Sequence, residues 1–476
     1  MNIEKLGLLA DYYEFTMSNG YILKNMNDIA YFDIFFRNVP DNGGYAIVAG
    51  LEQVIEFIEN LKFDEEEIEF LRSKKIFSEE FLSYLKDFKF SGDIWAIPEG
   101  TVVFPNEPLL TVRAPMVEAQ LLETMLLLIM NHQSLIATKT SRIVREASGR
   151  TVMEFGARRA HGTAAAIYGA RASIIGGAVG TSCTLTAKMF NVPASGTMAH
   201  SWIQSFDSEY EAFKTYAETY PDGCTFLVDT YNTLESGIPN AIKVFDEVLK
   251  PKGKRPVAIR LDSGDLAYLS KKARVMLDEA GYEDCKICLT NSLDEYLISS
   301  LLKQGAKVDL FGVGENLITA KSDAVFGGVY KLVAIEKNGE IIPKIKISDN
   351  VDKILNPSFK KVYRFYSKDT NYALADVVAL ADEEIDENEY EIFDPKAPWK
   401  KKTLKNYYIK PLAEKIYDGG KLVYKSPGLA EIAKYEKEQV DTIWEEVKRL
   451  ENPQRYYVDL SKKLWDLKHE MIEKRK

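Results

Sequence analysis

The stretch from 256 to 291, "PVAIRLDSGDLAYLSKKARVMLDEAGYEDCKICLTN", contains two short apolar runs separated by one amphipathic segment. The runs "PVAIRL" and "KICLTN" have the length and composition of buried strands, and "AYLSKKARVMLDEAG" between them predicts a helix. Two strands joined through a helix are parallel neighbours in one sheet. The stretch therefore predicts a βαβ unit with polar residues where its first strand ends.

Similar apolar runs recur on both sides, separated by segments of helical length. They are "TVMEFG" (151–156), "ASGTMA" (194–199), "CTFLVD" (224–229) and "DLFGVG" (309–314). Six or more units over about 170 residues predict an irregular (β/α) barrel, with a doubly wound open sheet as the competing architecture. We expect this α/β barrel in residues 141–325, an α+β domain in 1–140, and strands and helices in 326–476 that pack back on the N-terminal domain.

The flanking segments carry strand and helix signals of their own. Residues 30–40 and 92–115 contain short β-type runs broken by Pro and Gly, and 117–148 predicts a long helix ending near Gly149. Asn338-Gly339 lies between two alternating runs and predicts a hairpin. The last fifty residues read as charged amphipathic helix with a break near Pro453.

Composition excludes several classes of function. The 476 residues carry a net charge of −10, which argues against a general nucleic-acid binder. The longest apolar run, Met125 to Met130, is too short to cross a membrane, and the N-terminus does not resemble a signal peptide. Four cysteines in a chain of this length do not make a disulfide framework. We expect a cytoplasmic protein that binds neither nucleic acid nor membrane.

Polar residues and glycines gather where the predicted strands end, which is where barrel enzymes build their active sites. The residues in these positions are Glu154, Gly156, Arg158, Arg159, His200, Arg260, Asp262, Ser263, Gly264, Asp265, Gly312 and Gly314. Arginine side chains bind phosphate or carboxylate with paired hydrogen bonds. "RLDSGDL" (260–266) suits a ribose diol and a phosphate, although Asp262 or Ser263 can also cap the next helix.

His200 lies among small residues in "ASGTMAHSWIQSF" (194–206). The chain has no G-x-S-x-G elbow and no convincing hydrolase triad, so this histidine suits a phosphoryl acceptor or a general base. Cys285 and Cys288 lack the further ligands that a zinc site needs. His132 reads as a core residue and His469 as a solvated one. The residues alone predict a barrel enzyme acting on a phosphosugar.

Nine stretches together resemble the nicotinate phosphoribosyltransferase family. In chain order they are "DYYEFTM" (11–17), "FFRNVPDNGGYAIVAGL" (35–51), "EGTVVFPNEPLLTV" (99–112), "EFGARRAHG" (154–162), "GTSC" (180–183), "SGTMAHSW" (195–202), "RLDSGDL" (260–266), "FGVGENLITA" (311–320) and "VYKLV" (329–333). The resemblance implies a type II phosphoribosyltransferase fold and a homodimer with shared active sites. It implies the conversion of nicotinate and phosphoribosyl pyrophosphate to nicotinate mononucleotide and pyrophosphate, coupled to ATP hydrolysis, in NAD salvage.

The resemblance also implies roles for individual residues. The catalytic set would be His200 as phosphoacceptor, Arg260 and Asp262. The nicotinate set would be Tyr13 from the partner subunit, Phe155, Arg158, Ser182, Thr197 and Arg260. The set for phosphoribosyl pyrophosphate would be Arg158, Asp262, Ser263, Gly264, Gly312 and Gly314. Mg²⁺ would enter with phosphoribosyl pyrophosphate and ATP, without metal ligands of the protein's own and without structural zinc.

Ser182 bears on the choice of base. The related nicotinamide enzyme has an aspartate at the matching place, which would repel a carboxylate, whereas a hydroxyl favours nicotinate. Nicotinamide phosphoribosyltransferase is the nearest alternative, and a non-catalytic phosphosugar-binding relative is another. Three residues depart from the family pattern: Glu315, Cys183 and His161.

Overall fold

The computed structural model describes residues 6–350 and 353–474. The chain forms two compact units. Unit 1 comprises Met1–Leu135 with Val325–Lys476, and unit 2 comprises Ile136–Ala324. Helix α6 (Glu123–Glu146) runs from one unit into the other.

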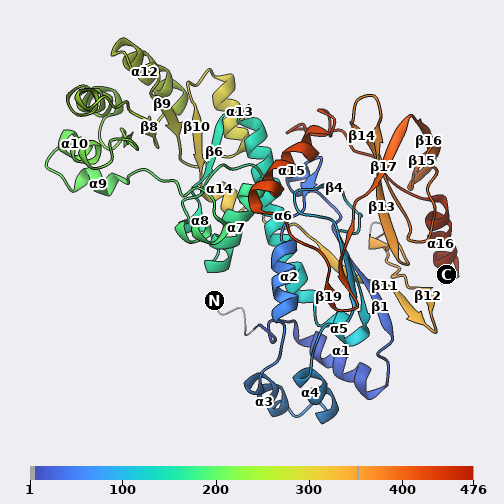
Figure 1. The fold of residues 1–476 in the computed structure, drawn as a ribbon. Coiled ribbons are helices and arrows are strands. Elements are labelled where there is room, and N and C mark those ends of the chain that lie inside the picture. The colour runs from blue at the N-terminus through green and yellow to red at the C-terminus, as the bar shows by residue number, and fades with distance from the viewer. Residues whose placement is uncertain (1–5, 351–352, 475–476) are drawn as a thin grey trace. The chain divides into compact units, whose positions relative to one another are not determined.

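Unit 2 is built on a parallel sheet of five strands in the order β6-β10-β9-β8-β7 (Figure 1). The strands are β6 (Thr151–Glu154), β7 (Thr225–Leu227), β8 (Ala258–Leu261), β9 (Lys286–Leu289) and β10 (Leu310–Val313). Beyond β6 the parallel pairing continues through two single bridges, from Glu154 to Thr181 and from Thr181 to Ala194. These pairings make the irregular α/β barrel that the sequence predicts.

The helices of unit 2 connect these strands. They are α7 (Thr163–Ile175), α8 (Thr184–Phe190), α9 (His200–Gln204), α10 (Glu209–Thr219), α11 (Ile238–Val244), α12 (Leu266–Glu279), α13 (Glu295–Lys303) and α14 (Glu315–Ile318).

The predicted strand at 194–199 is wrong. Ala194 makes one bridge, and the residues after it have no regular structure until α9 begins. Pro193 has no N–H to extend the pairing, and Gly196 weakens a strand because it has no side chain to pack. The other five predicted runs form the strands β6, β7, β8, β9 and β10.

Helix α12 shows how the turn after β8 is made. Asp265 caps the helix, its carboxylate accepting from the Tyr268 N–H at 2.9 Å. The alternative that Asp262 or Ser263 caps this helix is therefore wrong, and both side chains are left for other contacts. Gly264 has φ = +78°, which a residue without a Cβ adopts most easily.

Unit 1 contains a sheet of seven strands in the order β12-β11-β1-β5-β3-β18-β19. These are β1 (Ile29–Phe35), β3 (Asp93–Ala96), β5 (Leu110–Pro115), β11 (Val329–Lys337), β12 (Glu340–Pro343), β18 (Glu414–Asp418) and β19 (Lys421–Leu422). Strands β1 and β11, blue and orange in Figure 1, lie side by side although almost 300 residues separate them. The Asn338-Gly339 hairpin is confirmed, with φ of +53° and +81° at its two residues.

A second sheet in unit 1 has the order β17-β13-β14-β20. Its strands are β13 (Lys360–Ser367), β14 (Ala373–Leu380), β17 (Tyr407–Pro411) and β20 (Val458–Leu460). Two smaller ladders pair β15 (Glu389–Asp394) with β16 (Ala397–Lys405) and β2 (Ala46–Ile47) with β4 (Val102–Val103). The last fifty residues are interrupted around Pro453 as predicted, but the interruption is longer than a break in one helix: α15 ends at Asp441, β20 follows at Val458–Leu460, and α16 begins at Lys462.

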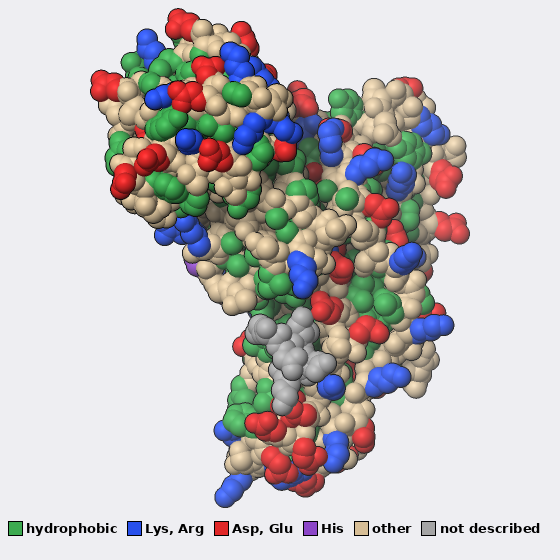
Figure 2. Space-filling model, turned by 60° about the vertical axis from the view of Figure 1, so that its left-hand side comes forward, with side chains coloured by type: hydrophobic (Ala, Val, Ile, Leu, Met, Phe, Trp, Pro, Cys, Tyr) green, Lys and Arg blue, Asp and Glu red, His purple; other side chains and the backbone are tan. Residues whose placement is uncertain are grey.

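The helices of unit 1 are α1 (Tyr12–Leu23), α2 (Leu51–Asn60), α3 (Glu65–Ser73), α4 (Glu79–Lys86), α5 (Met116–Gln120), α15 (Leu429–Asp441) and α16 (Lys462–Glu473). Figure 2 shows acidic side chains gathered where α3 and α4 lie. Several occupy the first turns of these helices, where negative charge complements the helix dipole: Glu65, Glu66, Glu67, Glu79 and Glu80. Within residues 6–350 and 353–474, no helix is both long and apolar enough to span a bilayer.

Candidate active site

The parallel strands of unit 2 bring polar residues to one edge of the sheet. Asp262 follows β8 directly and Thr290 follows β9, while Asp229 lies two residues beyond β7. Since β7, β8 and β9 are neighbours, their carboxyl ends meet at that edge. His200 and Thr197 join them from the segment that leads into α9.

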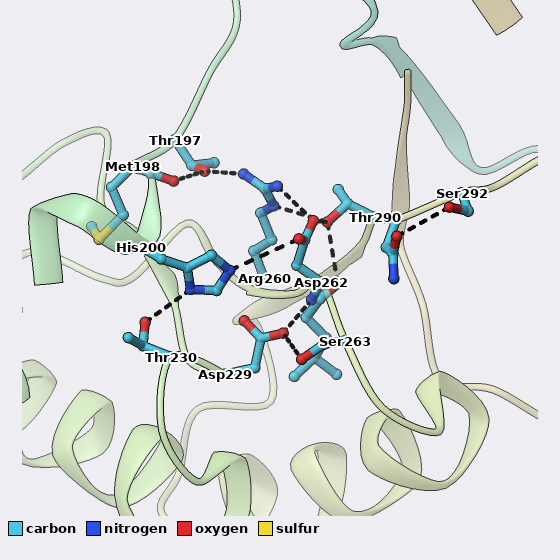
Figure 3. Close-up of polar contacts among 12 residues, drawn as sticks. Thr197, Met198, His200, Asp229, Thr230, Arg260, Asp262, Ser263, Thr290 and Ser292 are labelled. Carbon is cyan, nitrogen blue, oxygen red and sulfur yellow. Dashed lines mark hydrogen bonds and ion pairs between the residues drawn. The ribbon is translucent and has the colours of Figure 1, made fainter. Parts of the chain in front are cut away.

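Arg260 is the centre of this cluster (Figure 3). Its Nη1 donates to Thr197 Oγ1 at 3.0 Å, its Nε to Thr290 Oγ1 at 2.9 Å, and its Nη2 to Asp262 Oδ1 at 2.7 Å. The Arg260 side chain is 16% exposed. The guanidinium is thus fixed by three partners while part of it still faces solvent.

Asp262 is held in its ionised form. Burial acts against the charge, but the hydrogen bonds from Thr290 and Arg260 and the attraction of Arg260 and His200 together lower the pKa of Asp262 below its ordinary value. Both hydrogen bonds go to Oδ1. Oδ2 is left to face the imidazole of His200.

His200 has one partner on each side of its ring (Figure 3). Nδ1 lies 3.1 Å from Thr230 Oγ1, and Nε2 lies 3.8 Å from Asp262 Oδ2. The side chain is 39% exposed, so a ligand can reach the ring. Both contacts orient the imidazole while leaving it open for phosphoryl or proton transfer.

Asp229 and Thr230 are site residues that the sequence analysis missed. Oδ2 of the buried Asp229 accepts from the Asp262 N–H at 2.8 Å and from the Ser263 hydroxyl at 2.7 Å. Asp229 thereby fixes the turn after β8, and Thr230 meets His200. The available signal was their position: Asp229 ends the predicted run 224–229 and Thr230 follows it, just as the other site residues lie at the ends of their runs.

The predicted glycines Gly312, in β10, and Gly314, directly after it, lie against Phe155. A Cβ on Gly312 would stand 2.5 and 2.6 Å from two ring carbons of Phe155, and 2.7 Å from Thr290. A Cβ on Gly314 would stand 3.0 Å from the Phe155 carbonyl oxygen. In this structure the absence of side chains at these positions makes room for the ring of Phe155, which is partly exposed.

Ser182 is exposed and lies beside the end of β6. Its N–H donates to the Glu154 carbonyl at 2.8 Å, and the neighbouring Thr181 bridges to Glu154. The Ser182 hydroxyl thus lies on a backbone that is tied to the strand preceding Phe155.

The other predicted residues are more exposed and lie outside the Arg260 cluster. Arg158 is exposed in the short turn after β6. Glu315, the departure from the family pattern, lies 2.8 Å from Lys321 and 3.8 Å from Arg159. These cations lower its pKa, with Lys321 as the larger cause, so its charge is partly offset. Tyr13 belongs to α1 of unit 1, where it is exposed.

The cysteines and histidines outside the cluster have separate surroundings. His132, predicted as a core residue, is only half-buried. Cys224, Cys285 and Cys288 are buried and free, and across the described ranges no group of three His, Cys, Asp or Glu residues is placed to hold a metal ion. The expectation that His469 is solvated is wrong, since its ring stacks on Trp465 at a centroid distance of 3.6 Å. Trp465 lies one turn before His469 on α16, so the indole and the imidazole share one face of the helix.

Three family models match the chain. They describe the nicotinate phosphoribosyltransferase (NAPRTase) N-terminal domain over residues 8–131, the nicotinate phosphoribosyltransferase (NAPRTase) family over 151–371, and the nicotinate phosphoribosyltransferase C-terminal domain over 359–468. The matched ranges include every predicted site residue.

Individual proteins agree with these models. The nicotinate phosphoribosyltransferase of Bacillus subtilis (strain 168) is 45% identical over 473 residues, covering 98% of this chain and 96% of that one. The structure of human nicotinic acid phosphoribosyltransferase is 28% identical, with a TM-score of 0.86, and covers 97% of this chain and 99% of that one. The nicotinate-nucleotide pyrophosphorylase structure from Pyrococcus furiosus is 25% identical, with a TM-score of 0.70 and coverage of 92% and 96%. The chain belongs to the nicotinate phosphoribosyltransferase family.

Proposed function

We propose that this protein is an ATP-coupled nicotinate phosphoribosyltransferase. It would convert nicotinate, 5-phosphoribosyl 1-pyrophosphate, ATP and water to nicotinate mononucleotide, pyrophosphate, ADP and phosphate, and so feed NAD synthesis. The observation that carries the proposal is the cluster of His200, Arg260 and Asp262 at the carboxyl edge of the parallel sheet, in a chain of this family.

The sugar transfer needs two neighbouring subsites. Phe155, Arg158, Ser182, Thr197 and Arg260 would bind nicotinate, with the pyridine ring against Phe155 and the carboxylate near the hydroxyls of Ser182 and Thr197. Arg260 is suited to this because three contacts fix it before a ligand arrives.

The second subsite would take phosphoribosyl pyrophosphate. Asp262 and Ser263 would bind the ribose, and Gly264, Gly312, Gly314 and Arg158 would meet its phosphates. The transition state of this transfer carries positive charge on the sugar and negative charge on the departing pyrophosphate. The ionised Asp262 and the two arginines can stabilise these opposite charges.

His200 would accept a phosphoryl group from ATP. One imidazole nitrogen would attack the γ-phosphorus, the bond to the β-phosphate oxygen would break, and ADP would leave. Water would later hydrolyse the phosphohistidine to release phosphate. Thr230 would hold the Nδ1 edge of the ring during these steps, and the neighbours Gly196 and Ala199 have small side chains.

The sequence predicts no metal ligands of the protein's own, but two carboxylate oxygens of the site fit Mg²⁺ carried in with the pyrophosphate. Oδ1 of the buried Asp229 has no hydrogen-bond partner among the described residues, and Oδ2 of Asp262 lies outside the hydrogen bonds of that carboxylate. Magnesium in such sites takes one or two carboxylates and is otherwise held by water and substrate phosphates. When bound, the ion supplies neutralisation of the pyrophosphate charge.

The proposal includes a cytoplasmic homodimer in which Tyr13 of one subunit stacks on the nicotinate bound by the other. Two exposed apolar pairs support self-association. Tyr13 and Met17 lie one turn apart on α1, and Leu185 and Met189 lie one turn apart on α8. Side chains of this kind on exposed helix faces are typical of subunit interfaces.

The test is product formation with phosphoribosyl pyrophosphate and Mg²⁺. Nicotinate, nicotinamide and quinolinate are supplied in parallel, each with and without ATP, to the wild-type protein and to His200→Asn. We expect mononucleotide from nicotinate, stimulated by ATP in the wild type and not in the variant. Acid-labile phosphate from γ-labelled ATP should appear on the wild-type protein alone.

Three outcomes would contradict parts of this proposal. Turnover of nicotinamide alone would assign the other base, and turnover of quinolinate alone would assign a different reaction. Absence of product from all three bases would favour a non-catalytic phosphosugar-binding role.

A further inference from the structure

Glu154 is a buried carboxylate that the reaction described above does not use. It ends β6, directly before Phe155, and its side chain is 0% exposed. One oxygen, Oε1, accepts from the Gly156 N–H, and the other, Oε2, accepts from the Thr181 hydroxyl at 2.5 Å. Both oxygens therefore have partners inside the protein, and neither faces a ligand.

Thr181 relays this contact to two further segments. Its hydroxyl also accepts from the Cys183 N–H at 2.9 Å. Its backbone accepts from the Ser195 N–H at 2.9 Å and donates to the Pro193 carbonyl at 3.1 Å. The Thr181 side chain is fully buried.

The Glu154–Thr181 pair thus joins three segments that carry the proposed nicotinate residues. The first is 155–158 with Phe155 and Arg158, the second is 180–183 with Ser182, and the third is 193–197 with Thr197. We propose that Glu154 and Thr181 are positioning residues that hold these three segments in the geometry that binds nicotinate, a role that rests on the proposed function.

The turn after β6 packs tightly against the Glu154 carboxylate. A Cβ on Gly156 would stand 2.5 Å from Ile318 Cβ and 2.8 Å from Glu154 Oε1, so the turn closes directly onto the carboxylate. Burial raises the pKa of Glu154, against the hydrogen bonds from Thr181 and Gly156 that lower it. A carboxylate buried in this way is costly unless hydrogen bonds compensate for the lost water, as those from Thr181 and Gly156 do here.

The hydrogen bonds of the Glu154–Thr181 pair can be removed one partner at a time, which makes the proposal testable. Thr181 donates to Glu154 and accepts from Cys183, so valine at 181 keeps the shape and removes both bonds, whereas serine keeps both. Glutamine at 154 can keep the bond from Gly156 but presents an amide N–H₂ where Thr181 donates. Thr186 supplies a matched control, because its buried hydroxyl donates to the Ile167 carbonyl at 3.1 Å within the same unit.

The experiment measures kcat and the KM for each substrate in wild type, Thr181→Val, Thr181→Ser, Glu154→Gln and Thr186→Val, with thermal melting of each. We expect Thr181→Val and Glu154→Gln to raise the nicotinate KM at least about tenfold and the phosphoribosyl pyrophosphate KM less than about threefold. Thr181→Ser should restore the nicotinate KM. Thr186→Val should lower the melting temperature without changing either KM.

The outcomes separate the two proposals. An active wild type with an unchanged nicotinate KM in Thr181→Val would overturn the positioning role alone. Equal rises of both KM values, or a rise in Thr186→Val as well, would also overturn it and indicate general loosening. A wild type that does not use nicotinate would overturn the proposed function and this role with it. If Thr181→Val does not fold, Glu154→Gln and direct titration of nicotinate binding decide the question.

Discussion

Nε2 of His200 lies 3.8 Å from Oδ2 of Asp262, where the start of α9 approaches the carboxyl end of β8. The other carboxylate oxygen is occupied by Thr290 and Arg260. One negatively charged oxygen of Asp262 therefore faces the imidazole of His200 at ion-pair distance. Thr290 is 2% exposed, and its hydroxyl stabilises the ionised form of Asp262 by donating a hydrogen bond to it.

Replacing Thr290 with valine should change the pH dependence of the reaction. Loss of the hydrogen bond to the ionised form raises the pKa of Asp262 from its lowered value towards the ordinary one. We therefore expect the acid limb of kcat/KM for phosphoribosyl pyrophosphate to move to higher pH. Thr290→Ser is the control, and identical profiles for the two variants would contradict the assignment.

Gly312→Ala should damage the nicotinate site through Phe155. The new methyl group would stand 2.5 Å from the Phe155 ring, so the ring must move or the strand must shift. We expect a loss of about 1–3 kcal/mol in stability and a higher KM for nicotinate. Melting and steady-state kinetics measure the two effects. Gly223→Ala, where no atom lies within 4 Å of an added Cβ, should leave both unchanged. An unaltered nicotinate KM in Gly312→Ala would show that the Phe155 ring does not touch the substrate.

The sequence predicts the parts of this site that are local in the chain. Arg260, Asp262 and Ser263 share one motif, and the apolar runs before them are short and rich in β-branched residues, so both strand and turn could be identified. The packing of Gly312 against Phe155 could not, because it arises when β10 pairs with β6 across more than 150 residues. A glycine after a strand suits a phosphate and an aromatic ring equally well.

Asp229 and Thr230 belong to no motif, so the sequence offers their position at the end of a predicted strand but not their partners. Asp229 and Thr230 gain their roles from β7 lying next to β8, and the sequence does not state that order. The short run at 194–199 predicts a strand from its position between helical segments, but Pro193 and Gly196 prevent one from forming. The second sheet of unit 1 combines β14 with β20 from a segment that reads as helical, and only tertiary pairing defines that strand.

Ser182→Asp should shift the choice of base. The serine is exposed and its backbone is tied to Glu154. In the proposed binding mode an aspartate at 182 would face the nicotinate carboxylate. Two like charges about 4 Å apart repel by roughly 1 to 4 kcal/mol in partly solvated surroundings, which raises the nicotinate KM about 5-fold to about 1,000-fold. Nicotinamide turnover should increase. Thr184→Asp adds the same charge two residues away and should have little effect. Equal nicotinate KM values in the two variants would place the carboxylate elsewhere.

Glu14→Gln should make unit 1 less sensitive to pH. Glu14 is 0% exposed on α1, and its Oε2 has no hydrogen-bond partner among the described residues. Burial is the largest cause that raises its pKa to about 7, against the hydrogen bonds from Thr124 and Asp11. The native state therefore binds a proton that the unfolded chain releases above its ordinary pKa, so stability falls as pH rises between about 4.5 and 7. Glutamine keeps the acceptor oxygen and carries no charge, so the variant should melt like the wild type near pH 4.5. Near pH 8 it should be more stable by up to about 3 kcal/mol. Melting curves across this range, with the exposed Glu66→Gln as control, measure the difference; parallel curves for Glu14→Gln and the wild type would mean that Glu14 titrates normally.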